Sequence, residues 1–233
     1  LVGGASKLTE SFKKEVFPYL KENYRINNTK LAIGHSLSGT YLAQTLIETP
    51  ELFNALLLIS PNFVYDNEQL LDSANTISSN IKRYNTYVFS VSGNIGALEK
   101  EFNPAIQKID SLFKRNQLKP TQWSHQIIEN YNHGTILLQG IHKGLLDYSS
   151  HFDLSKLNNR GYNYLSEGNF EDAFISFQRG IDLYPNDSNI YDSFGEAKEK
   201  SGDLKQAKAY YALAIEKLKN ENDKFSKEEF LRR

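Results

Sequence analysis

Residues 1–150 of the chain show two kinds of hydrophobic pattern. Four short apolar runs have the length and composition of buried strands, at residues 30–33, 55–60, 86–91 and 123–128. Four other stretches carry an apolar residue every three or four positions, as amphipathic helices do, at residues 8–20, 37–48, 106–113 and 135–148. Strands that alternate with helices indicate an α/β fold with a mostly parallel sheet and flanking helices.

Two local features modify this pattern. Pro18 lies inside the first helical stretch, where it is expected to kink the helix or to mark a helical restart. A polar stretch rich in Asn and Ser at residues 66–80 separates the second and third strands and is expected to form a loop.

A repeat with a period of 34 residues begins at about residue 154. Six positions recur: Leu157, Gly161, Gly168, Ala173, Phe177 and Gly180 return as Tyr191, Gly195, Gly202, Ala207, Tyr211 and Ala214. The period and the residue types are typical of tetratricopeptide repeats, in which small residues let paired helices approach. We therefore expect two domains, at residues 1–152 and 153–233. In the second, a pair of helical hairpins is expected at 157–190 and 191–224, followed by a charged capping tail at 220–233.

Composition narrows the classes of function. Of 233 residues, 39% are apolar and 24% are charged, and the formal net charge of −1 gives no reason to expect nucleic acid or anionic lipid as a partner. No apolar run approaches the roughly 20 residues that cross a bilayer. The sequence contains no cysteine, which excludes disulfides and thiolate metal sites.

The beginning of the chain also carries information. It starts at Leu1 and contains no methionine, so we expect it to be the C-terminal part of a longer protein. Residues 1–30 lack the basic start and apolar core of a signal peptide. The compartment therefore stays open between the cytoplasm and the periplasm or exterior.

A candidate nucleophile lies where the first strand turns into a helix, in the run Gly34-His35-Ser36-Leu37-Ser38-Gly39. A serine on such a turn raises its hydroxyl above the sheet, and the first N–H groups of the following helix face developing negative charge. We predict Ser36 as the nucleophile and the backbone N–H of Leu37 as an oxyanion-hole donor. The second donor is expected from a loop after an earlier strand that is not in this chain. The alternative is a turn rich in Gly and Ser without chemistry.

The general base is expected later in the chain, because α/β-hydrolases order their triad as serine, acid and histidine. Of the five histidines, His133 follows the fourth strand and lies just before a helix, which is where such a base belongs. The other four lie inside the serine turn, within a strand, on a helix and near the domain junction: His35, His125, His142 and His151.

The acid is harder to assign. Glu99 and Glu101 are the first carboxylates after the third strand, and Glu129 lies four residues before His133. We predict Glu99, with the other two carboxylates and a serine–histidine dyad as open alternatives. Glu99 and Glu101 could also be ordinary charges in the first turn of a helix that begins near Pro104.

Several further runs carry a family resemblance: Gly3-Gly4-Ala5, Pro18-Tyr19, Tyr24-Arg25, Ile59-Ser60-Pro61, Asn132-His133-Gly134-Thr135 and Asn189-Ile190-Tyr191. Together with the serine turn they resemble the esterase family related to esterase D and the enterobactin esterases, in the branch whose esterase domain precedes tetratricopeptide repeats. The resemblance implies that residues 1–152 are the C-terminal portion of an α/β-hydrolase, with Ser36 as nucleophile and His133 as general base.

The chain departs from the family pattern at two positions. Ser38 stands where the family usually has glycine. Ile95 stands where related sequences tend to place a glutamate, which favours a dyad or an acid displaced to Glu99 or Glu101.

The sequence therefore predicts a serine esterase that hydrolyses carboxylic esters without a metal or organic cofactor. Its substrate is expected to be a small-molecule ester, and the repeats offer a surface for a protein or peptide partner. The alternative is a degenerate hydrolase that acts as a protein-interaction module through its repeats. The isolated chain is expected to lack activity without its earlier strands.

Overall fold

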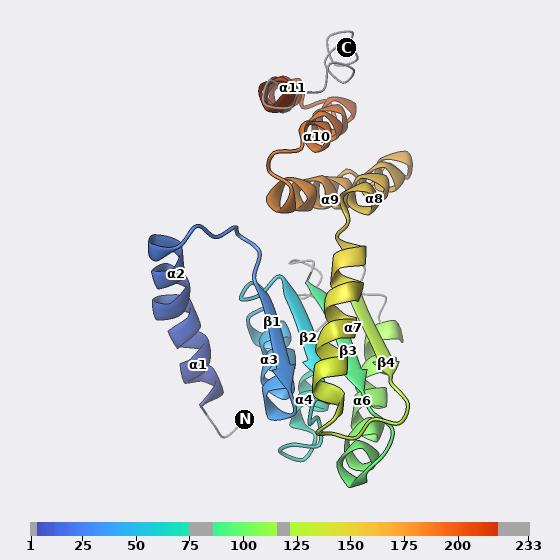
Figure 1. Cartoon of the computed structure of the whole chain (residues 1–233). Coiled ribbons are helices and arrows are strands. Elements are labelled where there is room, and N and C mark those ends of the chain that lie inside the picture. The colour runs from blue at the N-terminus through green and yellow to red at the C-terminus, as the bar shows by residue number, and fades with distance from the viewer. Residues whose placement is uncertain (1–3, 75–85, 116–121, 219–233) are drawn as a thin grey trace. The chain divides into compact units, whose positions relative to one another are not determined.

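The computed structural model describes residues 4–74, 86–115 and 122–218 of the chain (Figure 1). Its contacts divide the chain between Tyr148 and Ser149 into two compact units. This division falls inside one helix, and the domain bounds 1–152 and 153–233 stay a prediction. Within the described ranges, every helix is too short or too polar to cross a membrane.

The first unit contains a sheet of four parallel strands, which confirms the predicted architecture. The strands pair in the order β1-β2-β3-β4, with bounds Leu31–His35, Ala55–Ile59, Tyr87–Ser92 and Gln122–Ile127. All residues of β2 and β3 are buried, which is why these strands read as continuous apolar runs. Because all strands are parallel, their carboxyl ends meet at one edge, so the loops that follow them lie together.

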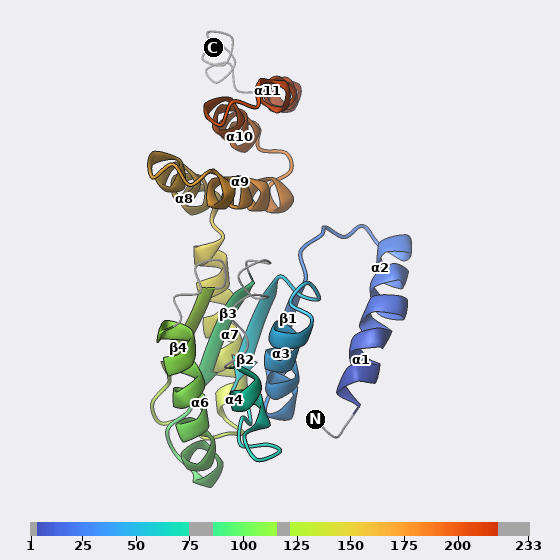
Figure 2. The same cartoon turned by 180° about the vertical axis from the view of Figure 1, so that it is seen from behind.

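Helices cover both faces of this sheet. One face carries α3 (Leu37–Glu48), α4 (Gln69–Ala74) and α6 (Ala97–Arg115), and the opposite face carries α7 (Ile136–His151) (Figure 2). The main core lies between β2, β3 and the first group of helices: Leu42, Leu46, Leu56, Leu58, Val88, Phe102, Ile106 and Ile109. On the other face, Gly140 of α7 lets the helix approach Ile59 and Val91.

Three short elements precede the sheet: α1 (Ala5–Ser11), a wider π-helical turn η1 (Phe12–Val16) and α2 (Phe17–Asn23). Pro18 lies in the first turn of α2, where a missing N–H costs nothing, so the predicted disturbance at Pro18 is a helical restart. An apolar pocket of about 720 Å³ lies between these helices and β1, lined in part by Leu8, Phe12 and Leu42.

The predicted start of the third helix near Pro104 is wrong. The helix α6 begins at Ala97, and Pro104 lies inside it. An internal proline removes one backbone hydrogen bond, but Phe102, Ala105 and Ile106 on either side are buried in the core. Tertiary packing thus overrides the local preference.

Between residues 154 and 218, the second unit contains four helices: α8 (Leu154–Ser166), α9 (Phe170–Leu183), α10 (Ser188–Lys200) and α11 (Leu204–Leu218). They pack as two successive hairpins, as predicted from the repeat. Their shared core combines large aromatic and aliphatic side chains with small alanines: Ala173, Phe177, Ile190, Phe194, Ala197 and Ala214. The predicted capping tail at 220–233, the end of the second repeat and residues 75–80 of the polar stretch lie outside the described residues; α4 occupies part of the remainder of that stretch.

Candidate active site

Ser36 occupies the turn between β1 and α3 in a strained conformation. Its φ of 59° and ψ of −125° are unusual for a residue other than glycine. The turn is fixed from both sides, because the N–H of Ser36 donates to the carbonyl of Ile59 at 3.0 Å and its own carbonyl accepts the N–H of Asn62 at 3.2 Å. A serine so placed matches the sharp strand-to-helix turn on which hydrolase nucleophiles lie.

The departure at Ser38 has a structural explanation. A Cβ at Gly34 would lie 2.6 Å from the carbonyl oxygen of Ser38, so the close approach of strand and helix depends on Gly34. The hydroxyl of Ser38 donates to the carbonyl of His35 at 2.7 Å and lies 2.8 Å from the N–H of His35, which it accepts. Ser38 therefore closes the turn with its side chain rather than disturbing it.

Leu37 is the first residue of α3, directly after Ser36. The N–H groups of a first helical turn have no acceptor within their own helix and carry the positive end of its dipole. Leu37 thus has the position that an oxyanion-hole donor requires.

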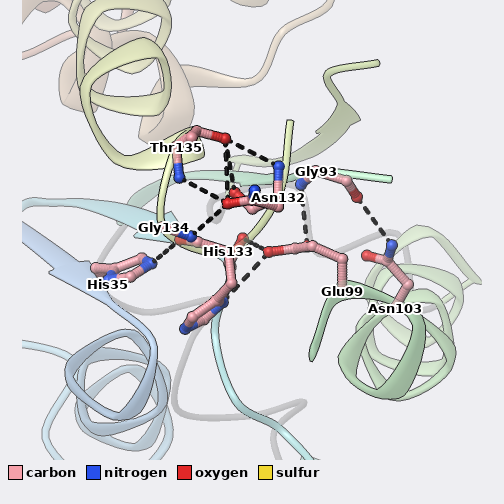
Figure 3. Close-up of polar contacts among 9 residues, drawn as sticks. His35, Gly93, Glu99, Asn103, Asn132, His133, Gly134 and Thr135 are labelled. Carbon is pink, nitrogen blue, oxygen red and sulfur yellow. Dashed lines mark hydrogen bonds and ion pairs between the residues drawn. The ribbon is translucent and has the colours of Figure 1, made fainter. Parts of the chain in front are cut away.

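Glu99 and His133 come together at the carboxyl edge of the sheet (Figure 3). Atom Oε1 of Glu99 lies 3.3 Å from Nδ1 of His133, and the Glu99 side chain is completely buried. The same Oε1 accepts the hydroxyl of Ser60 at 2.6 Å, while Oε2 accepts the N–H of Gly93 at 3.0 Å. The other two candidate acids, Glu101 and Glu129, are exposed.

The loop that carries His133 is tightly braced. The side-chain oxygen of Asn132 accepts the N–H groups of Gly134 and Thr135, each at 3.0 Å (Figure 3). Phe102 meets the His133 ring edge-on, with ring centroids 5.2 Å apart. The side chain of His133 keeps 16% of its surface exposed, so a substrate can reach it.

His35, which the sequence analysis set aside, lies against His133. The two rings are 4.4 Å apart, and Nε2 of His35 is 2.9 Å from the backbone carbonyl of His133, to which it donates when protonated (Figure 3). Burial lowers the pKa of His35, and the neighbouring His133 lowers it further, against opposing effects of the carbonyl and Glu99. Since His35 directly precedes Ser36, this contact brings the turn of Ser36 next to His133.

The remaining histidines lie elsewhere. His125 is in β4 with Nδ1 3.0 Å from the hydroxyl of Ser90, and burial lowers its pKa to about 4. His142 is exposed on α7. His151 belongs to the second unit, where burial and then Arg160 lower its pKa to about 4.

Models of known protein families match both parts of the chain. The family model described as "Putative esterase" matches residues 2–143, which is more than half of the chain. The chain belongs to this esterase family. Tetratricopeptide repeat models match residues 157–187 and 188–216, so the esterase domain is followed by repeats, as the resemblance implied.

Solved structures share the fold of the esterase domain. The siderophore hydrolase EstB of Aspergillus nidulans is 18% identical with a TM-score of 0.53, covering 61% of this chain and 57% of its own. An IroE-like serine hydrolase of Shewanella oneidensis is 15% identical with a TM-score of 0.60, covering 91% and 67%. The BES protein of Bacillus cereus is 19% identical with a TM-score of 0.54, covering 61% and 54%. The chain therefore spans little more than half the length of EstB, and no curated protein matches it significantly.

Two parts of the site were missed by sequence reasoning, the hydroxyl of Ser60 and the N–H of Gly93. Both follow directly on strands, at the edge where the site forms. That shared position is the signal that could have identified them, because ligand and catalytic groups of parallel sheets gather there.

Proposed function

We propose that this protein is a serine esterase that hydrolyses carboxylic ester bonds through an acyl-enzyme. Ser36 is the nucleophile, His133 the general base and Glu99 the acid, with the N–H of Leu37 as an oxyanion-hole donor. The observation that carries the proposal is the pairing of the buried Glu99 with the partly exposed His133, 3.3 Å apart beside the strained turn of Ser36. Their order along the chain is the one that α/β-hydrolases use.

The geometry suggests how the reaction proceeds. With a proton on Nδ1 directed at Glu99, the other ring nitrogen of His133 is free to accept a proton. It takes the hydroxyl proton of Ser36 as the serine oxygen bonds to the ester carbonyl carbon. The N–H of Leu37 stabilises the resulting oxyanion at the start of α3. His133 then protonates the leaving alcohol, and water, activated by the same base, releases the acid from Ser36.

The first experiment measures hydrolysis of a short-chain chromogenic ester by the natural full-length protein. Ser36→Ala should lower kcat/KM by at least about 1,000-fold, since the nucleophile is lost while the fold remains. Ser166→Ala, an exposed serine in the repeats, is the matched control and should leave the rate unchanged. Wild-type turnover by Ser36→Ala would exclude the proposed mechanism.

The second candidate function is that of an interaction module. It is motivated by the two repeats at 157–187 and 188–216, because such repeats act in protein binding. A fluorophosphonate probe separates the two: an esterase is labelled at Ser36, and a degenerate hydrolase is not. Because EstB is named a siderophore hydrolase, the substrate panel should include siderophore-type esters.

A further inference from the structure

Ser60 has an unusual place in the fold. It follows the last residue of β2, its side chain is completely buried, and its φ is +40°. Its N–H donates to the carbonyl of Val91 at 2.7 Å, so the strained backbone is held by the neighbouring strand. L-residues other than Asn and Asp rarely adopt such a conformation, and glycine adopts it without strain.

The hydroxyl of Ser60 makes a hydrogen bond that a glycine at this position could not make. It donates to Oε1 of Glu99 at 2.6 Å, the same oxygen that faces Nδ1 of His133. Hydrogen bonds to an ionised carboxylate are short and strong, and this one is shielded from water. With Gly93 on Oε2, both carboxylate oxygens have a fixed partner other than His133.

These two donors determine the direction of the carboxylate. Without Ser60, Oε1 would lose its shorter hydrogen bond and keep only the 3.3 Å contact with the imidazole that it has to orient, so it could shift out of line with Nδ1. The ring would then be free to take the wrong tautomer, with its proton on the nitrogen that must face the serine.

We propose that Ser60 is a positioning residue that keeps the Glu99 carboxylate aligned with Nδ1 of His133. This role rests on the serine esterase function proposed above. Ser60 touches neither substrate nor nucleophile in this role and acts only through Glu99. Its loss should lower kcat and leave KM unchanged, because substrate contacts stay intact.

The test compares Ser60→Gly with Ser60→Ala in the natural full-length protein. Both remove the hydroxyl, but glycine also relieves the positive φ. If the hydroxyl matters, both variants should lose about 10- to 100-fold in kcat at unchanged KM. If Ser60→Gly keeps the wild-type kcat, serine has no positioning role and the proposal fails. Should Ser60→Ala unfold because of its strain, Ser60→Gly alone still decides.

A double-mutant cycle links the effect to Glu99. In a Glu99→Gln background, Ser60→Gly should change kcat by less than about 2-fold, because the group that it positions is already altered. Full additivity of the two losses would mean that Ser60 acts on something else.

A direct readout of His133 keeps this proposal separable from the esterase function. In wild-type protein the Nδ1 proton of His133 should give a downfield NMR signal, which Ser60→Gly should shift or broaden. The measurement is repeated in Ser36→Ala, where no turnover is needed. An unchanged signal overturns the role of Ser60, whereas an unaltered esterase rate in Ser36→Ala overturns the proposed function instead.

Discussion

A methyl group added at Gly93 would meet the carbonyl oxygen of Tyr131 at 2.1 Å, whereas one added at Gly161 would meet the ring of Phe177 at 2.4 Å. The first glycine lies in the esterase domain, where two backbones touch. The second lies in the repeats, where a helix backbone touches a side chain. Glycine makes room in both cases, but the contact at Gly93 is to the backbone of the loop that carries His133, whereas the contact at Gly161 is to a side chain of the helical core.

This difference reflects how the two units are assembled. The esterase site joins loops from different parts of the chain, and their backbones are bonded to each other: the N–H groups of Asn94 and Ile95 both donate to the carbonyl of Tyr131. The repeats join neighbouring helices through small and large side chains in alternation. Substitutions at such contacts should therefore damage both function and stability in the first unit, but stability alone in the second.

The largest effect is expected from Gly93→Ala. The new methyl group must displace the loop of Tyr131, which carries His133, and with it the bond from Gly93 to Glu99. We expect kcat to fall more than about 100-fold and the free energy of unfolding to fall by about 3 to 4 kcal/mol. Ester hydrolysis and urea unfolding measure the two quantities.

Gly134→Ala is the matched control for that variant. It lies in the His133 loop, but its methyl group would have only an ordinary contact, 3.6 Å from the side-chain oxygen of Asn132. Its rate and stability should stay close to those of the wild type. Equal losses in both variants would show that any alanine in this region is harmful. The contact between residue 93 and the Tyr131 backbone would then not be the cause of the loss.

In the repeats, Gly161→Ala should cost more than Gly195→Ala. The ring of Phe177 is fully buried and has no room to move, whereas Tyr211, 2.7 Å from a Cβ at Gly195, is partly exposed and can swing outward. We expect losses of about 2 to 3 and about 1 kcal/mol in the free energy of unfolding, without a change in kcat per folded molecule. Thermal unfolding of the two variants checks the ranking, and a reversed ranking would contradict it.

An effect of similar size to that of Gly161→Ala concerns pH, where the two units should behave alike. His125 and His151 titrate at about 4 in the folded protein and near 6.5 when unfolded. The unfolded chain then binds more protons between these values, so stability falls as pH falls through this window. The free energy of unfolding should therefore fall by about 2 kcal/mol for each histidine between pH 7 and pH 5. Urea unfolding at both pH values measures this change. His125→Asn and His151→Asn should each make the free energy of unfolding less dependent on pH. An unchanged pH dependence would show that the replaced histidine is not buried in its neutral form.

Much of the fold could be predicted from local patterns. The apolar runs of β2 and β3 identify buried strands, the Gly34 to Gly39 run marks a strand-to-helix turn, and the 34-residue period defines the hairpins. These signals are local, or repeat at fixed spacing, and need no knowledge of the fold.

Local patterns favour Glu99 as the acid but do not exclude Glu101 or Glu129. Glu99 and Glu101 differ by two positions on one helix, so one side chain points into the fold and the other into solvent. Which one does so depends on where α6 begins, and the prediction of a start near Pro104 was wrong. Ser60 and His35 likewise gain their contacts from residues 39 and 98 positions away.

The shared carbonyl of Tyr131 has a consequence for how this site can diverge. Because the loop after β3 and the loop after β4 are hydrogen-bonded backbone to backbone, the segments that lead to Glu99 and to His133 are fixed to each other. An insertion or deletion in either segment would separate Glu99 from His133, even with both residues retained. We therefore expect length variation among relatives to fall in other loops, with the spacings from Gly93 to Glu99 and from Tyr131 to His133 unchanged.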